Sequence, residues 1–80
     1  MKLFYKPQVI KQLKRLPSSE KKKIARKLEL LIKDPFSGKL LKGELGGMRA
    51  LRVWPYRIVY IVRKDAVVVY SVAHRQGIYK

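Results

Sequence analysis

The chain has 80 residues, of which 20 are Lys or Arg and 5 are Asp or Glu, so its formal net charge is +15. This length excludes more than one domain, and it excludes a large enzyme with a deep cofactor site of its own. Because 48% of the residues are apolar and 10% are aromatic, the chain is not a disordered basic tail. We expect a small folded core whose charged surface meets an anionic partner.

The first elements in the sequence are a strand and a helix. Residues 3–5, Leu-Phe-Tyr, form an apolar and aromatic run that is typical of a short strand. Pro7 is acceptable at the first position of a helix, where its missing N–H would have no partner. Apolar residues then recur at helical spacing until Pro17 stops the helix, at Val9, Ile10, Leu13 and Leu16.

A second helix follows directly. Ser18 or Ser19 is expected to cap it by accepting a hydrogen bond from a free backbone N–H. Its apolar stripe consists of Ile24, Ala25, Leu28, Leu31 and Ile32. Asp34 ends the helix, because the following Pro35 pushes it out of the α region. The tight link between the two helices predicts an αα-hairpin.

The C-terminal half changes to a β pattern. Residues 36–47 hold four of the five glycines and are expected to form a loop. β-branched and aromatic residues then dominate three runs, 49–54, 56–63 and 66–73. The order β-α-α-β-β-β predicts an α+β domain, a small antiparallel sheet with the αα-hairpin packed on one face. The sheet contains the N-terminal strand and a C-terminal three-stranded meander. The sequence does not show at which edge of the meander the N-terminal strand lies.

Several absences narrow the chemistry. The chain has no cysteine, which excludes disulfides and thiolate metal sites. Its one histidine, His74, is too few for a histidine metal site. The five acids are scattered, which argues against a two-metal nuclease and against paired-carboxylate catalysis. We therefore expect neither a metal nor a cofactor.

The sequence also carries no signal for a membrane. No apolar run approaches the ~18 consecutive residues of a membrane span. The N-terminal residues 1–7 lack an apolar core long enough for a signal peptide. We therefore expect a cytoplasmic protein without a membrane partner.

The chemistry that remains lies in the arginines of the β half. Arginine is well suited to bidentate contact with phosphate. Five arginines lie on or next to the predicted strands: Arg49, Arg52, Arg57, Arg63 and Arg75. The lysines at 21–23 instead belong to a solvated helix face that attracts anions from a distance. We predict that at least two of the strand arginines contact phosphate.

The C-terminal run is the most distinctive segment. Alone, His74 would be an ordinary polar residue at a strand end, and Tyr79 a packing residue or part of a frayed tail. Together with Arg75 they place a proton carrier, a fixed cation and an aromatic ring within six residues. This combination suits RNA, because the ring can stack on a base and the cation can hold a phosphate.

With these residues the chain resembles the RelE-type toxins of the RelE/ParE superfamily, over essentially its whole length. The specific segments are Leu-Arg-Val at 51–53, Tyr-Arg-Ile-Val-Tyr at 56–60 and Val-Ala-His-Arg at 72–75, followed by Tyr79. The resemblance implies a single RelE-like toxin domain over residues 1–80. It also implies a metal-independent endoribonuclease that cleaves mRNA in the ribosomal A site by attack of the 2′-hydroxyl.

The resemblance also assigns catalytic roles. Arg57 matches the strand arginine that binds and stabilises the phosphate. Arg75 matches the arginine that protonates or stabilises the leaving oxygen. Arg52 matches one of two basic positions on the preceding strand, and the other falls on Ala50. If neither Arg49 nor Arg52 can act as the general base, either His74 is the candidate or proton removal is slow.

Further residues are expected to bind the substrate. Tyr79 matches the C-terminal tyrosine that stacks on a base. Arg49 lies next to the missing basic position, and Lys42 lies in the loop that matches the family. We therefore group Tyr79, Arg49 and Lys42 as substrate-binding residues.

The expected partners are mRNA on the ribosome, with its ribosomal RNA, and an acidic RelB-like antitoxin. A ParE-like toxin that inhibits DNA gyrase is one alternative, although such chains generally lack the catalytic basic residues. A non-catalytic module that binds RNA or the ribosome is the other, and the charge supports it equally.

Overall fold

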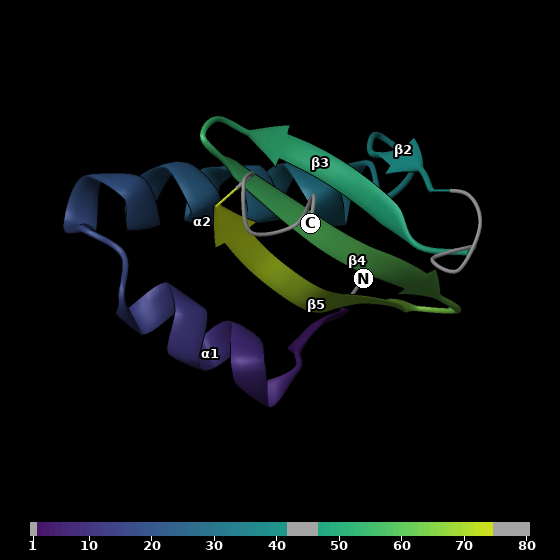
Figure 1. Ribbon diagram of the computed structural model, residues 1–80. Coiled ribbons are helices and arrows are strands. Elements are labelled where there is room, and N and C mark those ends of the chain that lie inside the picture. The colour runs from purple at the N-terminus through teal and green to yellow at the C-terminus, as the bar shows by residue number, and fades with distance from the viewer. Residues whose placement is uncertain (1, 42–46, 75–80) are drawn as a thin grey trace.

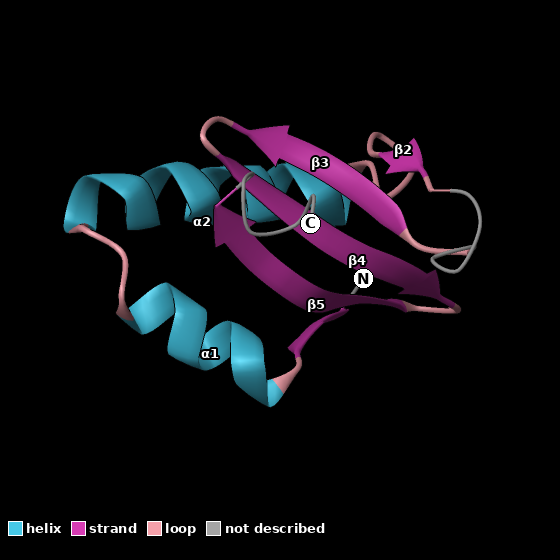
Figure 2. Cartoon of the chain, in the orientation of Figure 1, coloured by secondary structure: helices cyan, strands magenta, loops and turns pink. Residues whose placement is uncertain are grey.

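The structure is a computed structural model that describes residues 2–41 and 47–74. Its described part is α+β, with a five-stranded sheet in the order β1-β5-β4-β3-β2 (Figures 1 and 2). The elements are β1 (Lys2–Tyr5), α1 (Pro7–Lys14), α2 (Ser18–Lys33), β2 (Lys39–Leu40), β3 (Arg49–Val53), β4 (Tyr56–Arg63) and β5 (Ala66–His74). The predicted α+β class and the C-terminal meander are confirmed.

The sheet differs from the prediction in two details. β1 runs parallel to β5, so the sheet is mixed, although its other pairings are antiparallel. The predicted loop at 36–47 contains the short strand β2, which pairs with β3 through Lys39 and Leu40. Two residues are too few to show the alternation that marks a strand in a sequence.

The helix ends follow from the prolines. Pro7 is the first residue of α1, as predicted. The expected serine cap of α2 is wrong, because Pro17 is the N-cap residue and no side chain caps the helix. The Pro17 carbonyl accepts a hydrogen bond from the Lys21 amide at 3.0 Å. At the other end Asp34 has an extended φ of −139°, as a residue before proline should.

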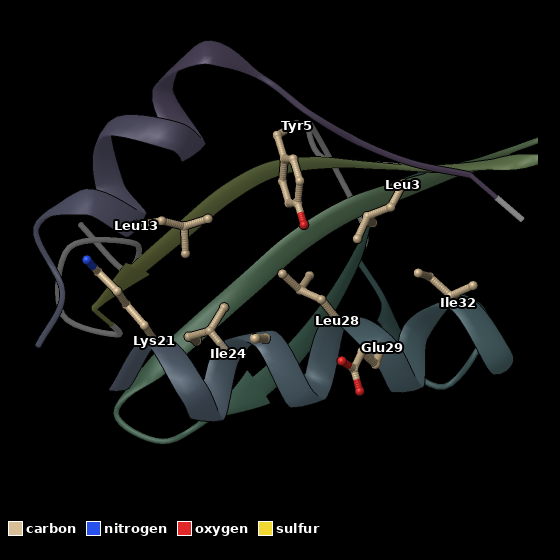
Figure 3. Close-up of a pocket in the computed structure, with 9 residues that line it drawn as sticks. Leu3, Tyr5, Leu13, Lys21, Ile24, Leu28, Glu29 and Ile32 are labelled. Carbon is tan, nitrogen blue, oxygen red and sulfur yellow. The ribbon is translucent and has the colours of Figure 1, made fainter. Parts of the chain in front are cut away.

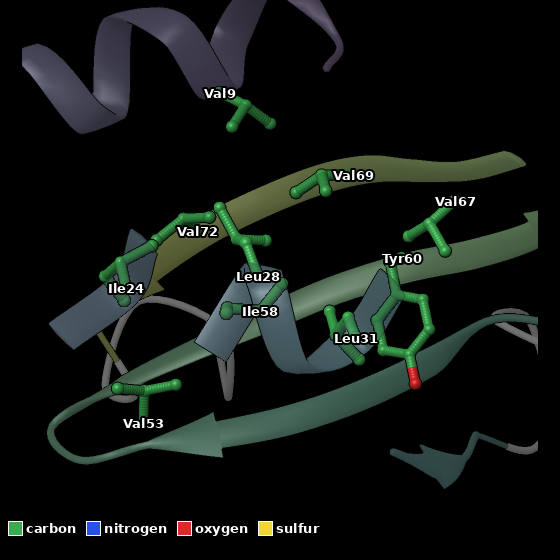
Figure 4. Close-up of a cluster of buried hydrophobic side chains, with 10 residues drawn as sticks. All are labelled: Val9, Ile24, Leu28, Leu31, Val53, Ile58, Tyr60, Val67, Val69 and Val72. Atoms are coloured by element: carbon green, nitrogen blue, oxygen red, sulfur yellow. The ribbon is translucent and has the colours of Figure 1, made fainter. Parts of the chain in front are cut away.

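The core lies between the sheet and the two helices (Figure 4). α2 contributes Ile24, Leu28 and Leu31, and α1 contributes Val9. The strands contribute the facing side chains, which are Val53, Ile58, Tyr60, Val67, Val69 and Val72. Core residues alternate along β4 and along β5 as far as Val69, and an irregularity at Tyr70 shifts the β5 pattern before Val72. One face of the sheet is therefore buried, and the neighbouring positions point the other way.

The two helices contact different parts of the sheet. α1 packs on β5 and β1, whereas α2 packs on β3. Ile10 stays 47% exposed, and Ala25 is exposed as well. The apolar stripes read from the sequence are therefore wider than the surfaces that the core covers.

Side chains of α1 complete the hydrogen bonds of β5. Beyond Val69, β5 has no paired residue on β1. There Gln12 Oε1 accepts a hydrogen bond from the Val72 amide at 2.8 Å, and Gln8 Nε2 donates one to the Tyr70 carbonyl at 2.8 Å. Tyr70 is the residue that the β4–β5 register skips. α1 thus takes the place of a further strand at this edge.

Neither helix of the described chain is long and apolar enough to cross a lipid bilayer.

Candidate functional site

Two of the predicted catalytic arginines lie side by side on the sheet. Arg52 of β3 and Arg57 of β4 are direct register partners. Their neighbours Val53 and Ile58 point into the core, so the two guanidinium groups belong to the opposite face. The face that carries the arginines is therefore the one turned away from α2.

The two arginines line one hollow, which we call the basic hollow. It measures about 340 Å³ and is lined by Ser37, Lys39, Leu41, Ala50, Leu51, Arg52 and Arg57. Three of these side chains are cationic and none is acidic. Like charges directly opposite each other on two strands destabilise a sheet. A bound phosphate would relieve this repulsion through bidentate contacts with the guanidinium groups.

Arg49 lies on the other face, away from the basic hollow. Its register partner is the buried Tyr60. Its Nη1 donates to the Gly38 carbonyl at 2.9 Å and to the Phe36 carbonyl at 3.5 Å. Its guanidinium group also stacks on the Phe36 ring, 4.9 Å from the ring centre. In this structure Arg49 holds the loop that follows α2.

Tyr60 holds the same loop from inside the core. Its hydroxyl donates to the Pro35 carbonyl at 2.7 Å and accepts from the Gly38 amide at 2.9 Å. Burial raises the pKa of Tyr60, although the Gly38 hydrogen bond and the Arg49 charge oppose the shift. These contacts fix the backbone on both sides of Ser37, which lines the basic hollow.

This anchor is not predicted by the sequence. Tyr60 is the last residue of the Tyr-Arg-Ile-Val-Tyr run, but nothing in the sequence connects it to Gly38. A Cβ at Gly38 would lie 2.5 Å from the Tyr60 hydroxyl and 3.0 Å from the Ala50 carbonyl oxygen. The only available signal was the glycine itself, because a close approach of two segments requires one.

His74 lies apart from the two arginines. It pairs with Tyr56, and the two rings meet edge to face with centres 5.8 Å apart. The register partner of Arg57 on β5 is Ala73, so His74 points to the helix side of the sheet. The other predicted site residues, Lys42, Arg75 and Tyr79, lie outside the described residues.

No group of three or more His, Asp or Glu side chains in the described part of the chain is arranged to hold a metal ion. The arrangement offers cations for an anionic ligand.

A second concave surface, the apolar groove, lies between the helices (Figure 3). It measures about 360 Å³, and its apolar or aromatic lining residues are Leu3, Tyr5, Leu13, Ile24, Ala25, Leu28 and Ile32. Lys21 and Glu29 complete the lining. Burial raises the pKa of Tyr5, whose ring points into the groove.

Solved structures of toxins have the same fold. The chain is 26% identical to a chain of the RelBE2 toxin–antitoxin complex from Mycobacterium tuberculosis, with 92% of this chain and 96% of that chain covered and a TM-score of 0.84. It is also 26% identical to a chain of the RelB–RelE antitoxin–toxin complex from Methanococcus jannaschii, where 95% and 94% are covered and the TM-score is 0.77.

A likeness at 22% identity, to the YoeB/ParE toxin from Agrobacterium tumefaciens, shows the fold alone; it covers 92% of this chain and 98% of that chain, with a TM-score of 0.81. No curated protein sequence matches the chain. A family model described as the ParE toxin of the type II toxin–antitoxin system parDE matches residues 3–79. The match spans nearly the whole sequence, so the chain belongs to the ParE toxin family, within the RelE/ParE superfamily that its sequence resembles.

Proposed function

We propose that the protein is a toxin that acts in the cytoplasm by cleaving mRNA on the ribosome, without a metal ion. The observation that carries this proposal is the pairing of Arg52 with Arg57 at the basic hollow. Two prepositioned guanidinium groups on one face suit the charge of a reacting phosphate. Family membership supports the toxin role, and the resemblance to RelE supports the reaction.

In this reaction the 2′-hydroxyl oxygen of the message bonds to the adjacent phosphorus. The bond from phosphorus to the 5′-oxygen of the next nucleotide then breaks and leaves a cyclic phosphate. The phosphate gains negative charge on the way, so a guanidinium group stabilises the transition state more than the ground state. We assign this stabilisation to Arg57 and Arg52, leaving-group protonation or stabilisation to Arg75, and base stacking to Tyr79.

The remaining role in this reaction is that of the general base, which removes the proton of the 2′-hydroxyl group. Arginine stays protonated in proteins, which favours charge stabilisation as the role of Arg52. Arg49 donates to two loop carbonyls, and His74 lies on the other face of the sheet. Substrate binding by Arg49 and proton removal by His74 therefore require the message to reach beyond the basic hollow, or the loop to move.

The test is a cell-free translation reaction with a defined message. We expect cleavage of the message that depends on the ribosome and proceeds in the presence of a metal-chelating agent at a level that spares the ribosome. A message that stays intact while translation proceeds normally would overturn the proposal.

A gyrase inhibitor is the second candidate function, because the matching family model is described as ParE. Such a protein would block supercoiling by DNA gyrase and leave RNA intact. The same preparation should therefore be tested in both reactions. Inhibited supercoiling without RNA cleavage would favour the ParE-like function.

The antitoxin is expected to be acidic, because the chain carries a net charge of +15. The RelBE2 and RelB–RelE relatives were solved as complexes of toxin and antitoxin. We assign the apolar groove to a helix of the partner, since its floor is apolar and Lys21 lies at its rim. A small acidic protein encoded in the adjacent reading frame should form this complex.

A further inference from the structure

A third concave surface, which we call the basic trough, runs between α2 and the end of β3. It measures about 500 Å³ and is lined by Lys23, Arg26, Lys27, Arg52, Val53 and Trp54. Four of these residues are cations, and none of the lining residues is acidic. The trough is therefore a concentrated positive surface on a chain that is basic throughout.

Trp54 is the unusual member of this lining. Its side chain is 62% exposed at the point where β3 turns toward β4. Tryptophan is highly buried on average, and an exposed ring beside several cations is typical of a surface that stacks on a base. The cations alone would be explained by a solvated helix face, but the aromatic ring would not.

The ion pair between Lys23 and Glu20 leaves the charge of this trough lysine available. Lys23 Nζ lies 3.5 Å from Glu20 Oε1, and more than half of the lysine side chain is exposed. Such a pair is weak in water. β2 pairs with β3 only at Arg49 and Ala50, so the edge beside Arg52 and Val53 carries no further paired residue of β2.

We propose that the basic trough is a second RNA-binding surface, which holds a single-stranded segment through phosphate contacts and the stacking of one base on Trp54. Arg52 lines both the trough and the basic hollow. Beyond the two residues paired with β2, β3 is the edge of the sheet, so Arg52 borders the hollow on one face and the trough on the other. A strand of RNA can therefore pass around this edge from one surface to the other.

Single-stranded RNA fits this surface better than a duplex does. A base must leave its own stack before an aromatic side chain can stack on it. A cationic groove with an aromatic platform binds such strands with little sequence preference and with strong salt dependence. The choice of RNA rests on the proposed function.

The test uses the full chain and a 2′-O-methyl RNA oligonucleotide, which lacks the 2′-hydroxyl needed for cleavage. Trp54 is the only tryptophan of the sequence, so its fluorescence reports on the trough alone. We expect the oligonucleotide to quench this fluorescence. The anisotropy of a label on the oligonucleotide then gives the affinity of each variant at several salt concentrations.

Two variants separate charge from stacking. Lys23→Ala/Lys27→Ala should weaken binding at least about tenfold and reduce the slope of log affinity against log salt by about 1.4, as expected for two lost phosphate contacts. Trp54→Ala should weaken binding about tenfold with an unchanged slope, and Trp54→Phe should restore most of the affinity.

The matched control is Lys11→Ala/Lys64→Ala, which removes the same charge from two exposed positions outside the trough. If the control lowers the affinity and the slope as much as the trough variant does, or if RNA leaves the fluorescence unchanged, the trough is not an RNA site. Normal message cleavage by wild type would then still support the proposed function. If RNA binds in the trough but no message is cleaved, the trough is an RNA-binding surface and the proposed nuclease activity is wrong.

Discussion

The hydroxyl group of Tyr60 connects the sheet to the loop that follows α2. It is fully buried and bonds both the Pro35 carbonyl and the Gly38 amide. Arg49 holds the same loop from the side, through its bonds to the Phe36 and Gly38 carbonyls. Single residues thus fix the wall of the basic hollow, although none of the three anchored loop residues is charged.

Gly38→Ala tests the close approach of this loop. The added methyl group would lie 2.5 Å from the Tyr60 hydroxyl, which cannot retreat because its ring is fully buried. We expect the free energy of unfolding to fall by about 1–3 kcal/mol. Urea denaturation measures the loss. In a Tyr60→Phe background the same substitution should cost less, and a strictly additive cost would contradict the contact.

The ionisation of Tyr60 gives a pH-dependent prediction. Its folded-state pKa is raised above the ordinary value of 10.0 by burial. Its contribution to stability is therefore complete below pH 10 and is lost as the pH rises through the folded pKa. Between about pH 9 and about pH 11, wild type should lose more unfolding free energy than Tyr60→Phe. Equal losses would show that Tyr60 is not the group responsible.

The positions of two arginines of the basic hollow on strands were predictable from the sequence, and their orientation was not. Arg52 and Arg57 were named from the sequence, and the strand that carries each was placed correctly. Which arginines share a face depends on the register between β3 and β4, and that register is set by long-range pairing. For the same reason the sequence grouped Arg49 and His74 with them.

At the scale of elements, α1 serves as the cover of a sheet edge. Its Gln12 side chain accepts a hydrogen bond from the Val72 amide, and its Gln8 side chain donates one to the Tyr70 carbonyl. The helix was predicted from its apolar spacing, but these bonds join residues about sixty positions apart and leave no local signal. The parallel pairing of β1 with β5 escaped prediction for the same reason.

Gln12→Ala measures how much this helix-to-strand hydrogen bond contributes to the stability of the fold. The Val72 amide would lose its acceptor in a partly buried place, so we expect a loss of about 1–3 kcal/mol of unfolding free energy. Gln8→Ala is the control, because its bond is exposed and should be worth about 0.5 kcal/mol. Thermal and urea denaturation of both variants provide the comparison. Equal effects would mean that water replaces Gln12 without cost.

At the scale of the whole molecule, the basic hollow and the apolar groove lie on separate surfaces. The basic hollow lies on the face turned away from α2, whereas the apolar groove lies between α2 and α1. A partner that fills the groove with a helix need not cover the hollow with the same segment. We therefore expect the antitoxin to bind the groove with the apolar face of a helix. Acidic residues in another segment of it should cover the basic hollow and block the activity of the toxin.

Ala25→Arg tests the groove as the docking site of the antitoxin. Ala25 is exposed and lines the groove, so a large charged side chain should block a helix without disturbing the core. We expect antitoxin affinity to fall at least about tenfold in calorimetry. Ser19→Arg is the control, because it adds the same charge to an exposed position of α2 outside the groove. Similar affinities for the two variants would contradict the assignment.

The central claim is that the message is cut at the paired arginines of the basic hollow. The most direct measurement is the rate of message cleavage on translating ribosomes for Arg57→Ala beside Arg63→Ala, which alters an exposed arginine at the other end of the same strand. We expect Arg57→Ala to lower the rate at least tenfold, as Arg75→Ala should, and Arg63→Ala to leave it near wild type. Equal rates for wild type and Arg57→Ala would contradict the account.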